Sequence, residues 1–244
     1  LAVAGPLARS IDDLALALDV LTQPTSHDRN VAPLLADTGG DVDISKLKIA
    51  WTDNFGGVPV SAEIKDKLHA FVKKLAQAGA TVHKVEPQGM DYNEIWETWG
   101  SFVGAQGNYD MSHLKRAIGH LFTKGTLKNL PMQRKIVGPT SVKKLMQAFE
   151  LQSQYITKMD NFLSDYDAWL CPVSATTAFK HHAHSKKFGD FKIYNQPLQV
   201  DGADIHYYLA TQSYTTVFST TNSPVVSMPI GLETTGLLVV EKTV

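Results

Sequence analysis

Apolar residues recur at strand spacing and at helical spacing in successive parts of the chain. Residues 47–51 and 81–85 are short apolar runs typical of strands, and the segment between them has helical spacing. Its apolar positions are Ile64, Leu68, Phe71, Val72 and Leu75. We expect Ser61 to cap this helix and Gly79 to end it. The β-α-β order predicts two parallel strands joined by a right-handed helical crossover, and therefore an α/β fold.

From residue 92 to residue 164 the apolar spacing is helical throughout. Trp96, Trp99, Phe102 and Val103 fall on one helix face, which indicates core packing. An apolar acyl pocket built from the same helix is the alternative interpretation. A last helix of this stretch should begin after a capping residue, Thr140 or Ser141, and run to residue 163.

The remaining third of the chain returns to strand patterns around one more helix. We expect strands at residues 167–172, 198–200, 225–229 and 237–240, a helix over 204–221, and an exposed loop from 173 to the strand at 198–200. Asp201-Gly202 is a hairpin turn signal. Together these elements predict a mixed β-sheet flanked by helices, with a helical insertion at about residues 90–165.

The N-terminal segment should be a buried helix. Ser10 is a capping serine, and Asp13 follows three residues later in a variant capping box. Leucines and alanines between residues 14 and 21 make the helix apolar on most sides, which predicts burial. Arg9 either braces a neighbouring loop with its planar guanidinium or forms a buried ion pair with Asp12 or Asp13. Residues 24–46 are rich in Asp, Gly and Pro, which is typical of a surface connection.

Composition narrows the range of partners. The chain has a formal net charge of −1 and its charges are interspersed, so we expect no nucleic-acid partner. The longest apolar stretch, residues 14–21, is too short to span a bilayer, so we also expect no membrane partner. Cys171 is the single cysteine and cannot form an internal disulfide. A reducing compartment is the simpler interpretation, which predicts a cytoplasmic location.

Four landmarks, in this order, resemble the amidase signature family. They are Gly5–Ser10 ahead of an apolar helix, Tyr166–Pro172 continuing to His181, Val200–Gly202 with Tyr207 and Tyr208, and Tyr214–Phe218 followed by Ser227–Gly231. The chain departs from the family at Ser219, where asparagine is usual, and at Asn222, where glycine is usual. Asn222 can adopt the left-handed backbone conformation that such a glycine would take. After Gly231 the family's usual glycine-rich continuation is also missing.

The resemblance implies hydrolysis of carboxylic amides to an acid and ammonia or an amine, through a serine acyl-enzyme, with no metal and no cofactor. The family uses a serine nucleophile, a bridging serine and a lysine base, beside a glycine-rich loop that serves as the oxyanion hole. These groups precede Gly5 in the family's order, and the sequence contains no Gly-Gly-Ser-Ser loop. We therefore expect the C-terminal part of a single amidase-signature domain, incomplete at both ends. Such a chain has no catalytic residue of its own and should be inactive alone.

Substrate contacts can be assigned only through the resemblance, which implies Cys171, Tyr214, Thr215 and Phe218 as pocket residues for a small-molecule amide. The alternative is a non-catalytic binding or assembly module derived from the same fold. An unrelated α/β binding domain is a third interpretation, but it requires the four landmarks to coincide by accident. If the chain is part of a longer amidase, the isolated chain should have an open sheet edge and exposed apolar surface, which favour association, for example as a homodimer.

Three other patterns have simpler explanations than catalysis or metal binding. Ser45 and Ser141 each precede a lysine by three residues (Lys48 and Lys144), a spacing used by some serine hydrolases. Ser45 leads into a strand, however, and Ser141 is better explained as a helix cap. His181-His-Ala-His184 lacks the further ligands of a structural zinc site, so a solvated loop is the better interpretation. Cys171 lies on an apolar strand with no basic neighbour in sequence, which favours packing or a pocket wall over nucleophilic chemistry.

Overall fold

The computed structural model describes residues 5–23, 42–107, 109–123, 125, 127, 129–184, 186–188, 191–232 and 238–243. The chain divides into two compact units. The smaller spans residues 2–43 and the larger spans residues 44–244.

The smaller unit contains one described helix, α1 (Ile11–Thr22). The backbone N–H of Asp13 donates to Ser10 Oγ over 3.1 Å, which confirms the predicted cap. The predicted burial is wrong, because no residue of α1 is buried, and Leu16 and Leu21 are 65% and 66% exposed. A segment as short as residues 2–43 has too little chain to enclose an apolar helix. Arg9 is exposed as well, so the predicted buried ion pair is also wrong.

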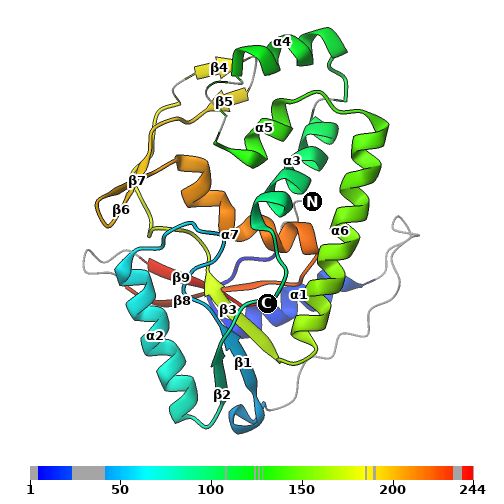
Figure 1. Cartoon of the computed structure of the whole chain (residues 1–244). Helices are drawn as coiled ribbons and strands as arrows, with labels where there is room; N and C mark the ends of the chain where they lie inside the picture. The colour runs from blue at the N-terminus through cyan, green and yellow to red at the C-terminus, as the bar shows by residue number, and fades with distance from the viewer. Residues whose placement is uncertain are drawn as a thin grey trace. The chain divides into compact units, whose positions relative to one another are not determined.

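A five-stranded mixed sheet forms the centre of the larger unit (Figure 1). Its strands are β1 (Lys48–Trp51), β2 (Thr81–Lys84), β3 (Ala168–Pro172), β8 (Val226–Leu232) and β9 (Leu238–Thr243), in the order β2-β1-β3-β9-β8. β1 is parallel to β2 and β3, whereas β9 is antiparallel to both β3 and β8. A short 3₁₀ turn (Ile44–Lys46) leads into β1. The predicted mixed sheet and its parallel pair are therefore confirmed.

Helix α2 (Ala62–Gln77) is the crossover between β1 and β2 and covers one face of the sheet. Leu68 and Val72 pack on Ile49 of β1 and Leu170 of β3. Gly79, with a φ of 104°, ends the helix as predicted. Ser61 occupies the N-cap position, but its hydroxyl makes no capping hydrogen bond, so that prediction is wrong in its chemistry. The side chain of Asp201 caps the helix instead, because the N–H of Ala62 donates to Asp201 Oδ2 over 2.7 Å.

Five helices make up the rest of the helical structure in the described part of this unit. They are α3 (Tyr92–Gly107), α4 (His113–Thr123), α5 (Pro131–Val137), α6 (Val142–Leu163) and α7 (Tyr207–Thr221). The N–H of Lys144 donates to Ser141 Oγ over 3.3 Å, which confirms the predicted cap of α6. The helical pattern predicted over residues 92–164 is confirmed by α3 to α6. Among the described residues no helix is long and apolar enough to cross a bilayer.

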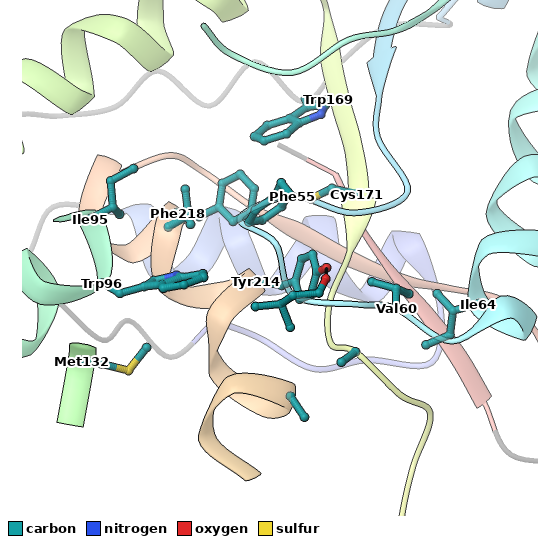
Figure 2. Packing of buried hydrophobic residues seen from close by; sticks show 14 of the residues in the cluster. Phe55, Val60, Ile64, Ile95, Trp96, Met132, Trp169, Cys171, Tyr214 and Phe218 are labelled. Carbon is teal, nitrogen blue, oxygen red and sulfur yellow. Dashed lines mark hydrogen bonds between the residues drawn. The ribbon is translucent and has the colours of Figure 1, made fainter. Parts of the chain in front are cut away.

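The main hydrophobic core lies on the sheet face opposite α2. Successive strand residues point to opposite faces, so Ala50, Trp169 and Cys171 turn toward α3, α6 and α7 while Ile49 and Leu170 turn toward α2. Figure 2 shows the rings of this core between the strand and the helices. Trp96 and Phe102 are buried, and Trp99 packs against the cluster, as the core interpretation predicted.

Two small hairpins lie between β3 and α7. The exposed loop predicted over 173–200 contains the first of them, β4 (Lys186–Phe188) with β5 (Phe191–Ile193). The second joins β6 (Leu198–Val200) to β7 (Ala203–Ile205) through Asp201 and Gly202, whose φ angles of 50° and 83° confirm the predicted turn. Because residues 203–205 pair as a strand, α7 begins at Tyr207 rather than at 204. Its C-cap is Asn222, whose φ of 54° confirms the left-handed conformation.

Candidate functional site

The four residues implied as substrate contacts lie at the junction of β3 and α7. Cys171 comes from β3, and Tyr214, Thr215 and Phe218 come from two turns of α7. Cys171, Tyr214 and Phe218 belong to one core cluster and are at most 1% exposed, whereas Thr215 is half-buried. The structure thus brings three of the four together in the core (Figure 2), and of the four only Thr215 is partly exposed. Their role in binding a substrate stays a prediction.

Aromatic rings fix the geometry of this cluster. The ring of Phe55 lies 4.6 Å from that of Tyr214, and the ring of Trp169 lies 5.5 Å from that of Phe218. Tyr214 donates its hydroxyl hydrogen to the carbonyl of Val58 over 2.6 Å, which ties the loop after β1 to α7. Burial raises the pKa of Tyr214 well above its ordinary value, so the phenol stays neutral and serves as a donor. The cluster is therefore a rigid apolar wall.

Helix α5 adds a buried polar group that sequence reasoning missed. Gln133 is 3% exposed, and its Nε2 donates to Gln212 Oε1 of α7 over 3.1 Å. Gln133 Oε1 has no hydrogen-bond partner among the described residues. The indole N–H of Trp96 donates to the carbonyl of Ser213 over 2.9 Å, next to this pair. Two glutamines 79 positions apart carry no spacing signal, so only the fold could have revealed them.

A second polar cluster lies where β1 ends. Asp53 Oδ2 accepts a hydrogen bond from Lys84 Nζ over 2.7 Å and one from His69 Nε2 over 2.8 Å. Burial by itself would raise the pKa of Asp53. The hydrogen bonds and charges of Lys84 and His69 outweigh that effect and hold the pKa below its ordinary value. Lys84 also lies 5.0 Å above the ring of Trp51. The ends of neighbouring parallel strands are where such groups gather, and this rule could have flagged Asp53.

Replacing Asp53 by asparagine is expected to destabilise the protein by about 1 kcal/mol at neutral pH, because two hydrogen bonds to a charged carboxylate weaken while the side chains of Lys84 and His69 stay partly solvated. The folded-state pKa of Asp53 is lowered, so its contribution is present above the unfolded value of 3.8 and is lost as the pH falls through the folded value. Urea unfolding at pH 7 and below pH 3 should show the difference between wild type and variant shrinking at low pH. Asp66→Asn, on an exposed position of α2, is the matched control. A difference independent of pH would contradict the charge argument.

A cavity of about 500 Å³ lies among α3, α5 and α6, and none of the four predicted contacts lines it. Glu97 forms ion pairs with Arg134 and Lys135 on its wall, and the Tyr155 hydroxyl donates to Glu94 over 2.5 Å. Both carboxylates of the wall, Glu94 and Glu97, therefore already have partners within the protein. On the basis of these carboxylates we assign no function to this cavity.

The remaining sequence patterns have structural roles. Ser141 caps α6 and Ser45 lies in the turn before β1, as the simpler explanations predicted. His181 and His184 are exposed, whereas the ring of His182 packs 5.7 Å from that of Phe179. Among the described residues, no three His, Cys, Asp or Glu side chains are grouped as metal ligands would be.

Comparison with known proteins agrees with this architecture. The sequence profile of the family described as "Amidase" matches residues 1–244. The chain is 24% identical to a glutamyl-tRNA(Gln) amidotransferase subunit of Halothermothrix orenii, over 96% of this chain and 50% of that protein. It is also 24% identical to an acylamidase of Rhodococcus erythropolis, over 95% of this chain and 46% of that protein.

A similar fold occurs in the crystal structure of a bacterial aryl acylamidase of the amidase signature enzymes, with a TM-score of 0.67 and 20% identity. That match covers 98% of this chain and 48% of the other. The chain therefore spans about half the length of the relatives that it matches.

Proposed function

Because this chain belongs to the amidase signature family, we propose that it forms the substrate-pocket part of an enzyme that hydrolyses carboxylic amides. In this proposal the serine nucleophile, the bridging serine, the lysine base and the oxyanion loop come from sequence outside residues 1–244. The observation that carries the proposal is the match of the family profile over residues 1–244. In addition, the chain spans only about half the length of the relatives that it matches.

The wall formed by β3 and α7 suits this role. Cys171, Tyr214 and Phe218 pack as a fixed apolar backing. Thr215, half-buried on the same helix, carries a hydroxyl that donates to the carbonyl of Gln212 over 3.2 Å. A pocket for a small amide is mostly apolar with a few convergent polar groups. Gln133 Oε1, buried at the neighbouring α5–α7 contact, is an amide acceptor without a partner among the described residues. A cytoplasmic location remains a prediction from the single cysteine.

The test compares two polypeptides on a simple aryl amide, 4-nitroacetanilide, whose hydrolysis to acetate and 4-nitroaniline is followed by the absorbance of the 4-nitroaniline. The purified 244-residue chain should give no more hydrolysis than a heat-denatured sample, because in this proposal the nucleophile, its base and the oxyanion loop all lie outside it. The longer polypeptide encoded by the same reading frame should hydrolyse amides and be labelled by a fluorophosphonate at a serine outside residues 1–244. Turnover by the 244-residue chain alone would contradict the proposal that the catalytic groups lie outside residues 1–244.

The alternative, a non-catalytic binding or assembly module, gives a different result. A longer polypeptide that binds amides by calorimetry but neither hydrolyses them nor reacts with fluorophosphonate would support that module and contradict the proposed hydrolase.

A further inference from the structure

The cavity among α3, α5 and α6 lies on the side of α3 that faces away from α7. Its volume of about 500 Å³ is in the range of small-molecule sites. Trp96 of α3 bonds to Ser213 of α7. Glu94 and Ser101, which line the cavity, are two positions before and five positions after Trp96, so they lie on the opposite side of the helix. The cavity is therefore separate from the predicted amide contacts on β3 and α7, and Figure 1 shows its three helices next to one another.

The charges on the wall of this cavity do not cancel. Three cations line it, Arg134, Lys135 and Lys144, against two carboxylates, Glu94 and Glu97, which leaves one positive charge when histidine is neutral. Glu97 is shared by Arg134 and Lys135, whose side chains are 42% and 43% exposed. One carboxylate cannot neutralise both of these cations. The wall therefore favours an anion.

Lys144 is the cation of the wall that forms no ion pair with any described residue. Its backbone N–H bonds to Ser141 Oγ, which fixes the first turn of α6, and the residue is exposed at the cavity. Lys143 is also exposed but does not line the cavity. Successive residues of a helix point about 100° apart, so only one of these two neighbours can belong to the wall.

An apolar surface follows Lys144 along the same face of α6. Ala148 and Leu151 line the cavity four and seven positions after Lys144, and this spacing places all three on one side of the helix. Ala148 is 4% exposed and Leu151 is half-buried. Gln147 lines the cavity between them and adds an amide. The face of α6 in the cavity thus combines a cation, an amide and a short apolar surface.

We propose that this cavity binds a small organic carboxylate with a short apolar body. Lys144 pairs with the carboxylate, and Arg134 and Lys135 raise the positive potential around it. A hydrogen bond between an ammonium and a carboxylate is stronger than one between neutral groups. Ala148 and Leu151 contact the apolar part of the ligand. A cationic ligand would add to the surplus positive charge, and an inorganic anion would leave the apolar surface without a contact.

Binding of benzoate to the full 244-residue chain tests the proposal, by calorimetry and by amide chemical shifts in two-dimensional NMR. We expect saturable binding, with shifts concentrated in residues 94–101, 134–140 and 144–151. Benzyl alcohol has the same ring without the charge and should bind about fivefold more weakly. Lys144→Gln should weaken benzoate binding about fivefold, because it removes a charge-assisted hydrogen bond at a partly solvated site.

The matched control is Lys143→Gln, which makes the same charge change on the neighbouring residue outside the cavity and should leave benzoate binding unchanged. Both lysines are exposed, so thermal unfolding should be nearly the same in the two variants. Equal loss in both variants, shifts centred on α7, or no saturable binding of benzoate would overturn the proposal. None of these outcomes requires amide hydrolysis, so a failure here is distinguishable from a failure of the proposed function.

Discussion

Replacing Trp169 by alanine is expected to lower the free energy of unfolding by about 3 to 5 kcal/mol, the usual cost of truncating a large buried ring. Trp169 is completely buried on β3, with its ring 5.5 Å from that of Phe162 and 5.6 Å from that of Phe55. Its indole N–H has no hydrogen-bond partner in the described part of the chain, so the loss comes from packing alone. Equilibrium urea unfolding followed by circular dichroism measures the change.

Two further variants keep this prediction testable if the alanine variant does not fold. Trp169→Phe retains one ring and should recover more than half of the lost stability, since the residual cavity is smaller. Phe179→Ala removes a ring that is 40% exposed and should cost about 1 kcal/mol or less. An equal, small effect at Trp169 and Phe179 would mean that the core does not close around Trp169.

Replacing Gly100 by alanine is expected to cost about 3 kcal/mol, the upper end for overpacking, even though alanine is the better helix former. A Cβ on Gly100 would lie 2.3 Å from the carbonyl oxygen of Met132 in α5. A backbone oxygen cannot rotate away as a flexible side chain could. Helices α3 and α5 would therefore have to separate, and the contact around Gly104, where a Cβ would lie 2.8 Å from two further α5 carbonyls, would open with them.

Gly107→Ala provides a control within the same helix, because a Cβ there meets nothing within 4 Å. It should leave stability unchanged or raise it by up to about 1 kcal/mol, as helix propensity predicts. Thermal and urea unfolding of the two alanine variants should give opposite signs. A stabilising effect at both positions would show that α3 and α5 do not pack backbone against backbone.

Local signals explain why much of the architecture could be predicted from the sequence. The spacing of Ile64, Leu68 and Val72 predicts α2 because a helix repeats on a scale of a few residues. Ser10 and Ser141 cap their helices through N–H groups only three residues away. Asn222 adopts its left-handed conformation because the short polar side chain of asparagine can form local hydrogen bonds there.

The features that sequence reasoning missed depend on residues far apart in the chain. The cap of α2 comes from Asp201, 139 residues beyond Ala62, so the local serine was the natural but wrong choice. Asp53 acquires its low pKa from Lys84 and His69, which only the fold brings to it. The apolar positions of α1 were visible, but periodicity identifies a face without saying what covers it.

The strand order has a consequence for how the chain acquires its structure during synthesis. β9 lies between β3 and β8, both of which precede it in the chain. A ribosome therefore releases β8 before the strand that joins it to the sheet exists. The parallel pair of β1 and β3 spans more than a hundred residues, so the centre of the sheet also waits for α3 to α6. Until β9 emerges, β8 is an unpaired strand, and that interval is when a nascent chain is most exposed to wrong pairing.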